Sequence, residues 1–286
     1  MISPYVRKHR LAAELRALRA EAHLTAAQLS KRSGEQQIQI SRLENGRLAD
    51  QASVMKILDA LGVDGDRWTQ IMTITREAGE KGWWESTRKM GDRQALYADL
   101  EAGATSIREY QQTFVPGLLQ IPEFVRARCE SDAGLGRQVE FIDGVVAGNA
   151  GRQRMLRRPN GPTYEVIIDE VAVRRLPAPP DVFKKQLYHL ATAVNADPKL
   201  TLRVLPIDAT IAGYTVPRCT FSLYTYADPG DPAVVAADSV TSDLVLTEPA
   251  DVTPYERLYT GLRQASLPQD DSLDLLTKAA AELPGT

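Results

Sequence analysis

The sequence predicts a mainly α N-terminal helix-turn-helix bundle followed by an α+β C-terminal domain. Short amphipathic helical patterns fill the first 80 residues, and segments with strand and helix periodicity alternate after them. Charge divides the chain in the same way. Residues 1–50 carry nine Lys and Arg against five Asp and Glu, a net of +4, which leaves −7 for the rest of a chain whose total is −3. The expected domains are therefore 1–80 and 81–286.

Composition excludes several classes of protein. The 286 residues are 43% hydrophobic and 25% charged, which is ordinary for a globular protein and not for a disordered chain. No apolar run approaches the roughly 20 residues of a membrane span, and the first residues lack the apolar stretch of a signal peptide. Cys129 and Cys219 are far apart and have no CxxC pattern, so no disulfide framework or metal site is expected. A cytoplasmic protein without a cofactor is predicted.

Five helices are predicted in the first domain. Leu11, Leu15 and Leu18 form one apolar stripe at spacings of four and three residues. Thr25 followed by Gln28 is a capping-box start, and a glycine follows the end of this second helix. The predicted helices span residues 7–22, 25–33, 36–45, 53–61 and 66–79.

The second domain mixes helices and strands. Helices are predicted over 94–110, 137–157, 181–195, 254–265 and 270–283. Strands are predicted over 164–168, 200–205 and 220–226, with weaker candidates at 233–237 and 244–246. The adjacent Trp83 and Trp84 lie at the expected junction between the domains.

The segment 24–47 carries the strongest functional pattern. It reads as a short helix, a turn containing Gly34 and a second short helix, with Leu29, Ile40 and Leu43 closing a small core. The outer face of the second helix carries amide and guanidinium groups, which can form paired hydrogen bonds with adenine and guanine in the major groove. The alternative is a small helical bundle with a solvated polar face.

The same residues resemble the Cro/C1-type (XRE-family) helix-turn-helix. The resemblance is carried by Leu24-Thr25-x-x-x-Leu29, by Gly34 and by Ile40-Ser41-Arg42-x-Glu44-x-Gly46. It implies a recognition helix over 36–44 that contacts double-stranded DNA, and a dimeric regulator. The DNA-binding candidates are Gln36, Gln37, Ile38, Gln39, Ser41, Arg42, Arg47 and Thr25.

Within this resemblance the candidates have different roles. Gln37, Ile38 and Arg42 match base-facing positions, and Arg47 matches a phosphate contact. Arg19 and Glu44 match a structural ion pair. Two positions depart from the family: Ala26 replaces a phosphate-binding Gln, and Gln36 replaces a Ser or Thr that caps the recognition helix better.

The rest of the chain resembles the actinobacterial domain of unknown function found in Scr-type antitoxin-like and WhiJ-like regulators. The resemblance rests on segments that recur in order: Trp83-Trp84, Leu100–Tyr110, Val115–Gln120, Arg152-Gln153, Asp169–Arg175, Gln186–Leu190 and Val204–Pro206. Pro179 and its neighbours replace a more usual Gly-containing turn, and Asp238 stands where the family tends to have Glu. This resemblance implies a transcriptional regulator, often with a small separately encoded partner protein, and no catalysis.

Two interpretations of the second domain remain open. Its polar residues set among apolar motifs could line a small-molecule site, for which the candidates are Arg108, Tyr110, Gln120, Arg152, Gln153, Glu170 and Arg174. The favoured alternative is an internal network of ion pairs and hydrogen bonds that joins the helical segment to the sheet, because buried charges are usually paired for structural reasons. The segment 115–120 is either a tight turn with an apolar anchor or part of a groove for a partner or ligand, and the turn is favoured.

Enzymatic motifs are missing from the sequence. It has no Gly-x-Ser-x-Gly, His-Glu-x-x-His, P-loop or Gly-x-Gly-x-x-Gly pattern, and its three histidines are dispersed. Asp169 and Glu170 would point to opposite faces of a strand, which argues against a paired acid–base site. The prediction is a DNA-binding transcriptional regulator. The alternative is an antitoxin-like protein that mainly binds a small toxin or partner protein and controls its own synthesis.

Overall fold

The computed structural model describes residues 1–48, 50–86, 90–134, 141–238 and 243–284. The chain divides into two compact units, which are described separately. Unit 1 consists of Met1–Ser86 together with Tyr226–Pro232, and unit 2 consists of Thr87–Thr225 together with Ala233–Thr286.

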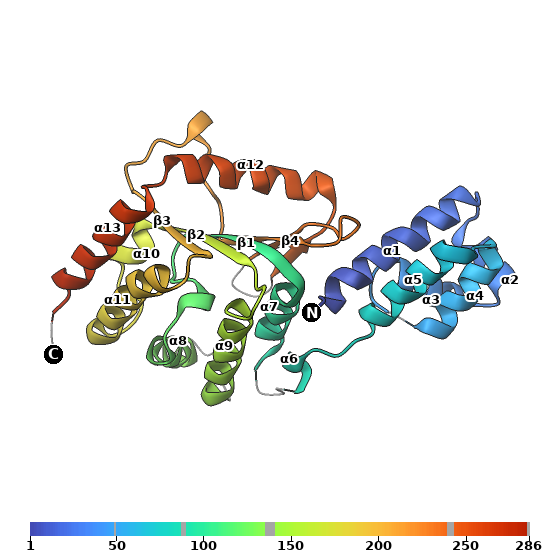
Figure 1. Ribbon diagram of the computed structural model, residues 1–286, viewed down its shortest axis with the longest axis horizontal. Coiled ribbons are helices and arrows are strands. Elements are labelled where there is room, and N and C mark those ends of the chain that lie inside the picture. The colour runs from blue at the N-terminus through green and yellow to red at the C-terminus, as the bar shows by residue number, and fades with distance from the viewer. Residues whose placement is uncertain (49, 87–89, 135–140, 239–242, 285–286) are drawn as a thin grey trace. The chain divides into compact units, whose positions relative to one another are not determined.

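Unit 1 is helical (Figure 1). Its helices are α1 (Pro4–Glu21), α2 (Ala26–Ser33), α3 (Gln37–Glu44), α4 (Gln51–Leu61), α5 (Gly65–Ala78) and the short α6 (Trp83–Ser86). The five helices predicted from the sequence are confirmed, with ends that differ by at most three residues. Thr25 forms the predicted capping box with Gln28, and Gly34 ends α2 in the left-handed conformation.

One apolar core joins the helices of unit 1. Leu29, Ile40 and Leu43 are fully buried in it, as predicted, beside the α1 stripe that includes Leu11 and Leu15. The helix-turn-helix is therefore held from its inner side, which leaves the other side of α3 available to solvent.

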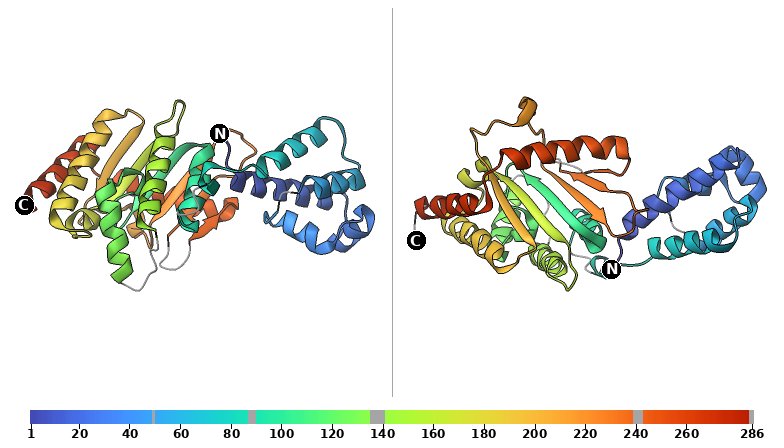
Figure 2. Two further views of the ribbon diagram at one scale, coloured as in Figure 1. Left: turned by 90° about the horizontal axis from the view of Figure 1, so that it is seen from below. Right: turned by 45° about the horizontal axis from the view of Figure 1, so that its top comes forward.

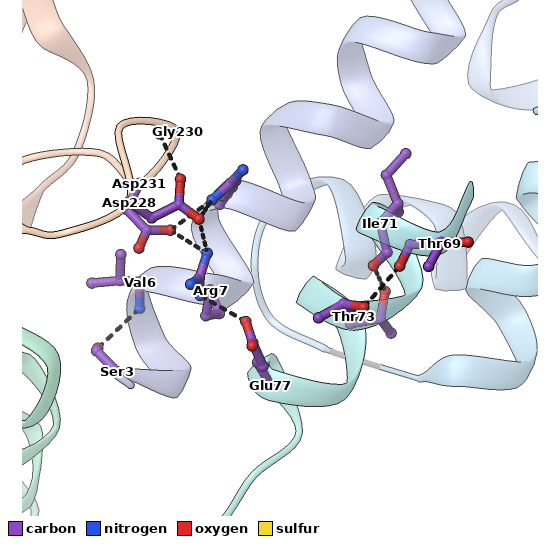
Figure 3. Close-up of polar contacts among 12 residues, drawn as sticks. Ser3, Val6, Arg7, Thr69, Ile71, Thr73, Glu77, Asp228, Gly230 and Asp231 are labelled. Atoms are coloured by element: carbon purple, nitrogen blue, oxygen red, sulfur yellow. Dashed lines mark hydrogen bonds and ion pairs between the residues drawn. The ribbon is translucent and has the colours of Figure 1, made fainter. Parts of the chain in front are cut away.

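The segment Tyr226–Pro232 belongs to unit 1 because aspartates in it bind arginines of α1 (Figure 3). The Arg7 guanidinium lies 2.9 Å from the Asp231 carboxylate and 3.0 Å from that of Asp228. Arg10 pairs with the same two carboxylates. Glu77 of α5 contacts Arg7 at 3.0 Å. A hydrogen bond from the Gly230 amide, assisted by the arginines, lowers the pKa of Asp228 to about 2.

Unit 2 is built on a six-stranded mixed sheet with the strand order β3-β2-β1-β4-β5-β6. The strands are β1 (Ala104–Gln111), β2 (Thr163–Asp169), β3 (Leu200–Leu205), β4 (Phe221–Tyr226), β5 (Val234–Ala237) and β6 (Leu244–Leu246). β1, β2 and β3 are parallel neighbours, with Ile107 opposite Tyr164 and Tyr164 opposite Leu200. β4, β5 and β6 pair in antiparallel fashion.

Helices cover both faces of this sheet (Figures 1 and 2). α12 (Pro249–Ala265) packs Val252, Tyr259 and Leu262 onto one face, against Phe221 and Leu223 of β4. The other face carries α7 (Asp92–Gly103), α8 (Pro122–Gly134), α9 (Ile142–Leu156) and α11 (Pro180–Ala196). α13 (Gln269–Glu282) packs against α11 and β3. The short elements are α10 (Glu170–Arg174), η1 (Gly117–Leu119) and η2 (Ala212–Tyr214).

The fold class is as predicted, an α-helical N-terminal region followed by an α+β domain. The prediction of one element was wrong. The sequence predicts a helix over 94–110, whereas α7 ends at Gly103 and the next eight residues form β1, in the middle of the sheet. Pairing with strands on both sides outweighs the helical propensity of this Ala- and Glu-containing segment. The sequence also gave no sign of α8, and α12 begins at Pro249 instead of Pro254.

The remaining predicted elements of unit 2 agree with the structure. All five predicted strands are present, and the helix predicted over 137–157 corresponds to α9, although residues 137–140 of it lie outside the described residues. No helix within the described ranges is long and apolar enough to cross a membrane.

Candidate nucleic-acid interface and C-terminal cavity

The recognition-helix candidate α3 is fixed by its inner residues. Ile40, Leu43 and Glu44 are buried, and their spacing of three and four residues puts them on the same face of the helix. The Glu44 carboxylate accepts two hydrogen bonds from Arg19, at 2.6 and 3.0 Å, and the Glu44 carbonyl accepts a third from Arg16 at 2.6 Å. The hydrogen bond to Glu44 raises the pKa of Arg19. The ion pair that the resemblance implied is therefore confirmed.

The outer residues of α3 meet solvent. Gln36, Gln37, Ser41 and Arg42 are exposed, and Ile38 leaves 59% of its surface exposed although it is apolar. None of these five side chains has an ion pair or side-chain hydrogen bond to another side chain among the described residues except Ser41, which is 3.4 Å from the Asn45 amide. These groups are thus free to contact a ligand.

The other DNA-binding candidates differ in their exposure and in the hydrogen bonds that their side chains already make. Gln39 is half-buried and its amide is 3.5 Å from the Ser53 hydroxyl, on the side of α4. The Thr25 hydroxyl is exposed but accepts the amide hydrogen of Gln28 as a cap. Arg47 is exposed just after α3. Gln36 occupies the N-cap position of α3 without a side-chain cap bond, as expected for a poor N-cap residue.

This arrangement has the chemistry of a major-groove reader. A short helix presents two amides and a guanidinium, which can pair with adenine and guanine, and an exposed isoleucine, which can contact a thymine methyl. The exposed start of α3 also leaves amide N–H groups unpaired within the helix, and these favour phosphate oxygens.

The ligand-binding candidates of the second domain do not gather at one place. Gln120 and Arg152 line a cavity of about 810 Å³ in unit 2. The Arg152 guanidinium is buried and bonds the Glu101 carboxylate at 2.6 Å; burial opposes its charge, but Glu101 raises its pKa. The Gln153 amide donates to the Gln120 carbonyl at 2.7 Å and does not line the cavity.

The other four candidates lie elsewhere in unit 2. Arg108 and Tyr110 alternate with the cavity residues of β1, so they point to the α12 face, where Arg108 is 3.4 Å from Glu256. The Tyr110 hydroxyl donates to Asp169 at 2.9 Å. Burial raises the pKa of Tyr110. Glu170 and Arg174 pair with each other, and Arg174 also pairs with Glu282 of α13.

Sequence reasoning missed the residues that form the floor of the cavity. They include Glu109 and Gln111 of β1, Glu101 of α7, Asn149 of α9 and Ser222 of β4, all buried. A signal existed in the alternation of Glu109 and Gln111 along 107–111, which places both on one face of a strand, but it appears only once this segment is known to be a strand. The segment 115–120 forms the turn η1 with buried Leu118 and Leu119, while its residues Val115, Gly117 and Gln120 also line the cavity.

Two family models match the chain. Residues 15–68 match the helix-turn-helix model HTH_3, which covers α2 and α3, and residues 94–278 match a domain of unknown function, DUF5753, which covers the sheet of unit 2. Neither a curated protein nor a solved structure matches the chain. The helix-turn-helix match supports a DNA-binding regulator.

Proposed function

Because the chain belongs to the DUF5753 family and carries a helix-turn-helix domain before the DUF5753 region, we propose that it is a cytoplasmic transcriptional regulator that binds operator DNA through α3. The observation that carries this proposal is the exposed polar face of α3. Gln37, Ile38 and Arg42 are exposed and lie together on a helix whose opposite face is buried. No catalytic role is proposed for either unit.

The protein acts as a homodimer in this proposal. A dimer of helix-turn-helix domains places its two recognition helices about 34 Å apart, one helical turn of DNA, and so binds a two-fold symmetric site. Arg47 lies just after α3, and free backbone N–H groups lie at the start of α3. Both supply phosphate contacts that fix the position of the protein along the DNA.

The C-terminal domain acts as the regulatory part of the protein. It binds a small molecule or docks a partner and thereby changes how tightly the protein holds its operator. The cavity of about 810 Å³ supports the small-molecule version.

A second candidate is the antitoxin-like role found in Scr-type and WhiJ-like regulators, in which the main partner is a small separately encoded protein. It is favoured by the loop between β3 and β4, where Ile207, Tyr214 and Val216 leave 76%, 87% and 73% of their surfaces exposed. Three largely exposed apolar side chains in one loop offer apolar surface to a partner protein. Co-purification of the chain with the product of a neighbouring small reading frame would favour this candidate.

The proposed DNA interface is tested by substitution. Gln37→Ala and Arg42→Ala should each weaken binding to a selected operator by about 1–3 kcal/mol, because each removes a base contact, and should leave the circular dichroism spectrum and melting temperature unchanged. Gln70→Ala and Arg76→Ala are matched controls, since they remove the same residue types from exposed positions on α5. Equal loss of binding in the controls, or unchanged operator preference in both α3 variants, would remove α3 as the reader.

A further inference from the structure

The cavity of unit 2 lies where the direction of strand addition changes. The strands that follow β1 in the chain, β2 and β3, extend the sheet on one side of it, and β4, β5 and β6 lie on its other side. The cavity is lined by Gln111–Val115, which leave β1 at its carboxyl end, and by Arg218–Thr220, which lead into β4. The cavity therefore lies at the carboxyl end of β1, beside the start of β4, where the Gln112 amide donates to the Thr220 hydroxyl at 3.2 Å.

Buried polar side chains are concentrated at this cavity. Of the eight polar or charged side chains buried in the described part of unit 2, six line it: Glu101, Glu109, Gln111, Asn149, Arg152 and Ser222. The other two, Gln186 and Ser272, bond backbone groups in the packed interior. Buried polar groups cost free energy unless they are hydrogen-bonded, so most of those in unit 2 are gathered at one place, where they bond to one another or to nearby backbone. A cavity of this size with convergent polar groups is typical of a small-molecule site.

The charges on the cavity floor do not balance. Arg152 and Glu101 neutralise each other through three hydrogen bonds of 2.6 to 3.2 Å. Glu109 has no ion pair among the described residues. Its carboxylate accepts hydrogen bonds only from the Gln111 amide, at 2.5 Å, and from the Tyr164 hydroxyl. The floor therefore has one carboxylate with hydrogen-bond donors but no direct cation.

The rim of the cavity has the opposite imbalance. Asp238 is bound by Tyr97 and by Arg93, at 3.3 Å, and Asp132 is bound by Arg128 at 3.4 Å. Arg218, by contrast, is exposed at the rim and has no ion pair or hydrogen bond among the residues described. The exposed Phe114 ring adds an apolar side chain to the rim, and the Arg128 guanidinium lies 4.5 Å from the centre of this ring.

We propose that this cavity binds a small zwitterion, whose ammonium group occupies the floor at Glu109 and whose carboxylate or phosphate group meets Arg218 at the rim. The ammonium supplies the cation that Glu109 lacks, and the anion supplies the partner that Arg218 lacks. This inference specifies the ligand of the regulatory domain and so rests on the small-molecule version of the proposed function. It does not depend on how the protein contacts DNA.

The test uses the full-length chain and two direct binding measurements. The twenty amino acids and ethanolamine phosphate, each at millimolar concentration, are screened by thermal shift, and each zwitterion that raises the melting temperature is titrated by calorimetry. Each is then compared with its two halves, the amine without the acid group and the acid without the amine. At least one zwitterion should bind, and both of its halves should bind at least tenfold more weakly.

Substitutions locate the site. Glu109→Gln and Arg218→Ala should each weaken binding of the zwitterion at least tenfold, while Glu256→Gln and Arg257→Ala on α12 should not. Glu109→Gln keeps the size of the side chain and one acceptor for the Tyr164 hydroxyl, so this variant should fold like the wild-type protein. Its melting temperature checks that it does. The proposal is overturned if no zwitterion in the panel binds, if the acid half binds as tightly as the zwitterion, or if both cavity variants bind like the wild-type protein. DNA binding, measured on the same preparation, reports separately on the proposed DNA-binding function.

Discussion

At the scale of single residues, the ion pair between Arg19 and Glu44 ties α1 to the end of α3. Two arginines of α1 bond the last residue of α3, one through its carboxylate and one through its carbonyl. Removal of one partner of a largely buried pair leaves the other charge desolvated and unpaired, which is costly.

Glu44→Ala should therefore lower the free energy of unfolding by about 2 to 4 kcal/mol, less than a fully buried pair because the Arg19 side chain is one-quarter exposed. Chemical denaturation of the full-length chain measures this. Glu21→Ala is the control, since Glu21 contacts Arg67 at 3.5 Å on the surface and its loss should change stability by less than about 1 kcal/mol. Equal effects of the two substitutions would contradict the structural role of Glu44.

A second residue-level prediction concerns the Glu109 carboxyl and the dependence of folding stability on pH. Burial raises the pKa of its carboxyl to about 7, although the hydrogen bonds from Gln111 and Tyr164 and the charge of Arg152 favour the ionised form. The nearby charge of Asp238 opposes ionisation further. Because the folded protein holds this proton more tightly than the unfolded chain does, the carboxyl favours folding less and less as the pH rises from about 4.5 to about 7.

The comparison of wild type with Glu109→Gln isolates this effect. The variant has no titrating group at this position. Because the Glu109 pKa is raised from 4.5 to about 7 in the folded wild-type protein, the free energy of unfolding of the variant relative to wild type should rise by about 2 to 3 kcal/mol between pH 4.5 and pH 8. Urea denaturation at a series of pH values measures the difference. A difference that is constant over this range would mean that Glu109 is ionised in the folded protein at low pH.

At the scale of elements, the two helices of the helix-turn-helix begin differently. α2 begins with a complete capping box at Thr25, whereas the side chain of Gln36 leaves α3 uncapped. An N-cap hydroxyl stabilises a helix by about 1 kcal/mol because it accepts one of the free N–H groups of the first turn.

Gln36→Ser should accordingly stabilise the protein by about 0.5 to 1 kcal/mol, and Thr25→Ala should destabilise it by about 1 kcal/mol. Both are measured by thermal denaturation of the full-length chain. If Gln36→Ser leaves the stability unchanged while Thr25→Ala lowers it, then the start of α3 is satisfied by a group other than a side-chain cap.

The elements also show how far sequence reasoning reaches. The helices of unit 1 could be predicted because their apolar periodicity, their caps and their turn glycine all indicate the same structure. β1 could not, because Arg108, Glu109 and Gln111 place polar side chains in a central strand, where an apolar run is the norm. Two of these residues, Glu109 and Gln111, also form part of the cavity floor, so the local rules fail where the strand carries the cavity's polar side chains.

The same reason explains which candidate site residues were recognised. The main DNA-binding candidates lie within one short helix, so sequence spacing alone places Gln37, Ile38 and Arg42 on one face. The cavity draws on α7, β1, α9 and β4, which are far apart in the chain, and only the tertiary fold brings them together. Sequence reasoning therefore reached Arg152 and Gln120 but not their neighbours.

At the scale of the whole molecule, the chain passes from unit 2 into unit 1 at the end of β4. β4 carries the cavity residues Ser222 and Tyr224, and the chain then passes directly into Tyr226–Pro232, whose aspartates bind Arg7 and Arg10 of α1. The segment of unit 1 that binds α1 is therefore the direct continuation of a strand that lines the cavity of unit 2.

In vitro selection from random DNA duplexes tests whether α3 reads operator DNA in a dimeric protein. We expect enrichment of a two-fold symmetric sequence whose half-sites lie about 34 Å apart, with the logarithm of affinity falling by about 0.9 per phosphate contact for each tenfold rise in salt. Arg42→Ala, selected in parallel, should lose the preference at one position of each half-site. Failure to enrich any sequence at low salt, or selection of the same sequence by Arg42→Ala with the same affinity, would contradict the claim.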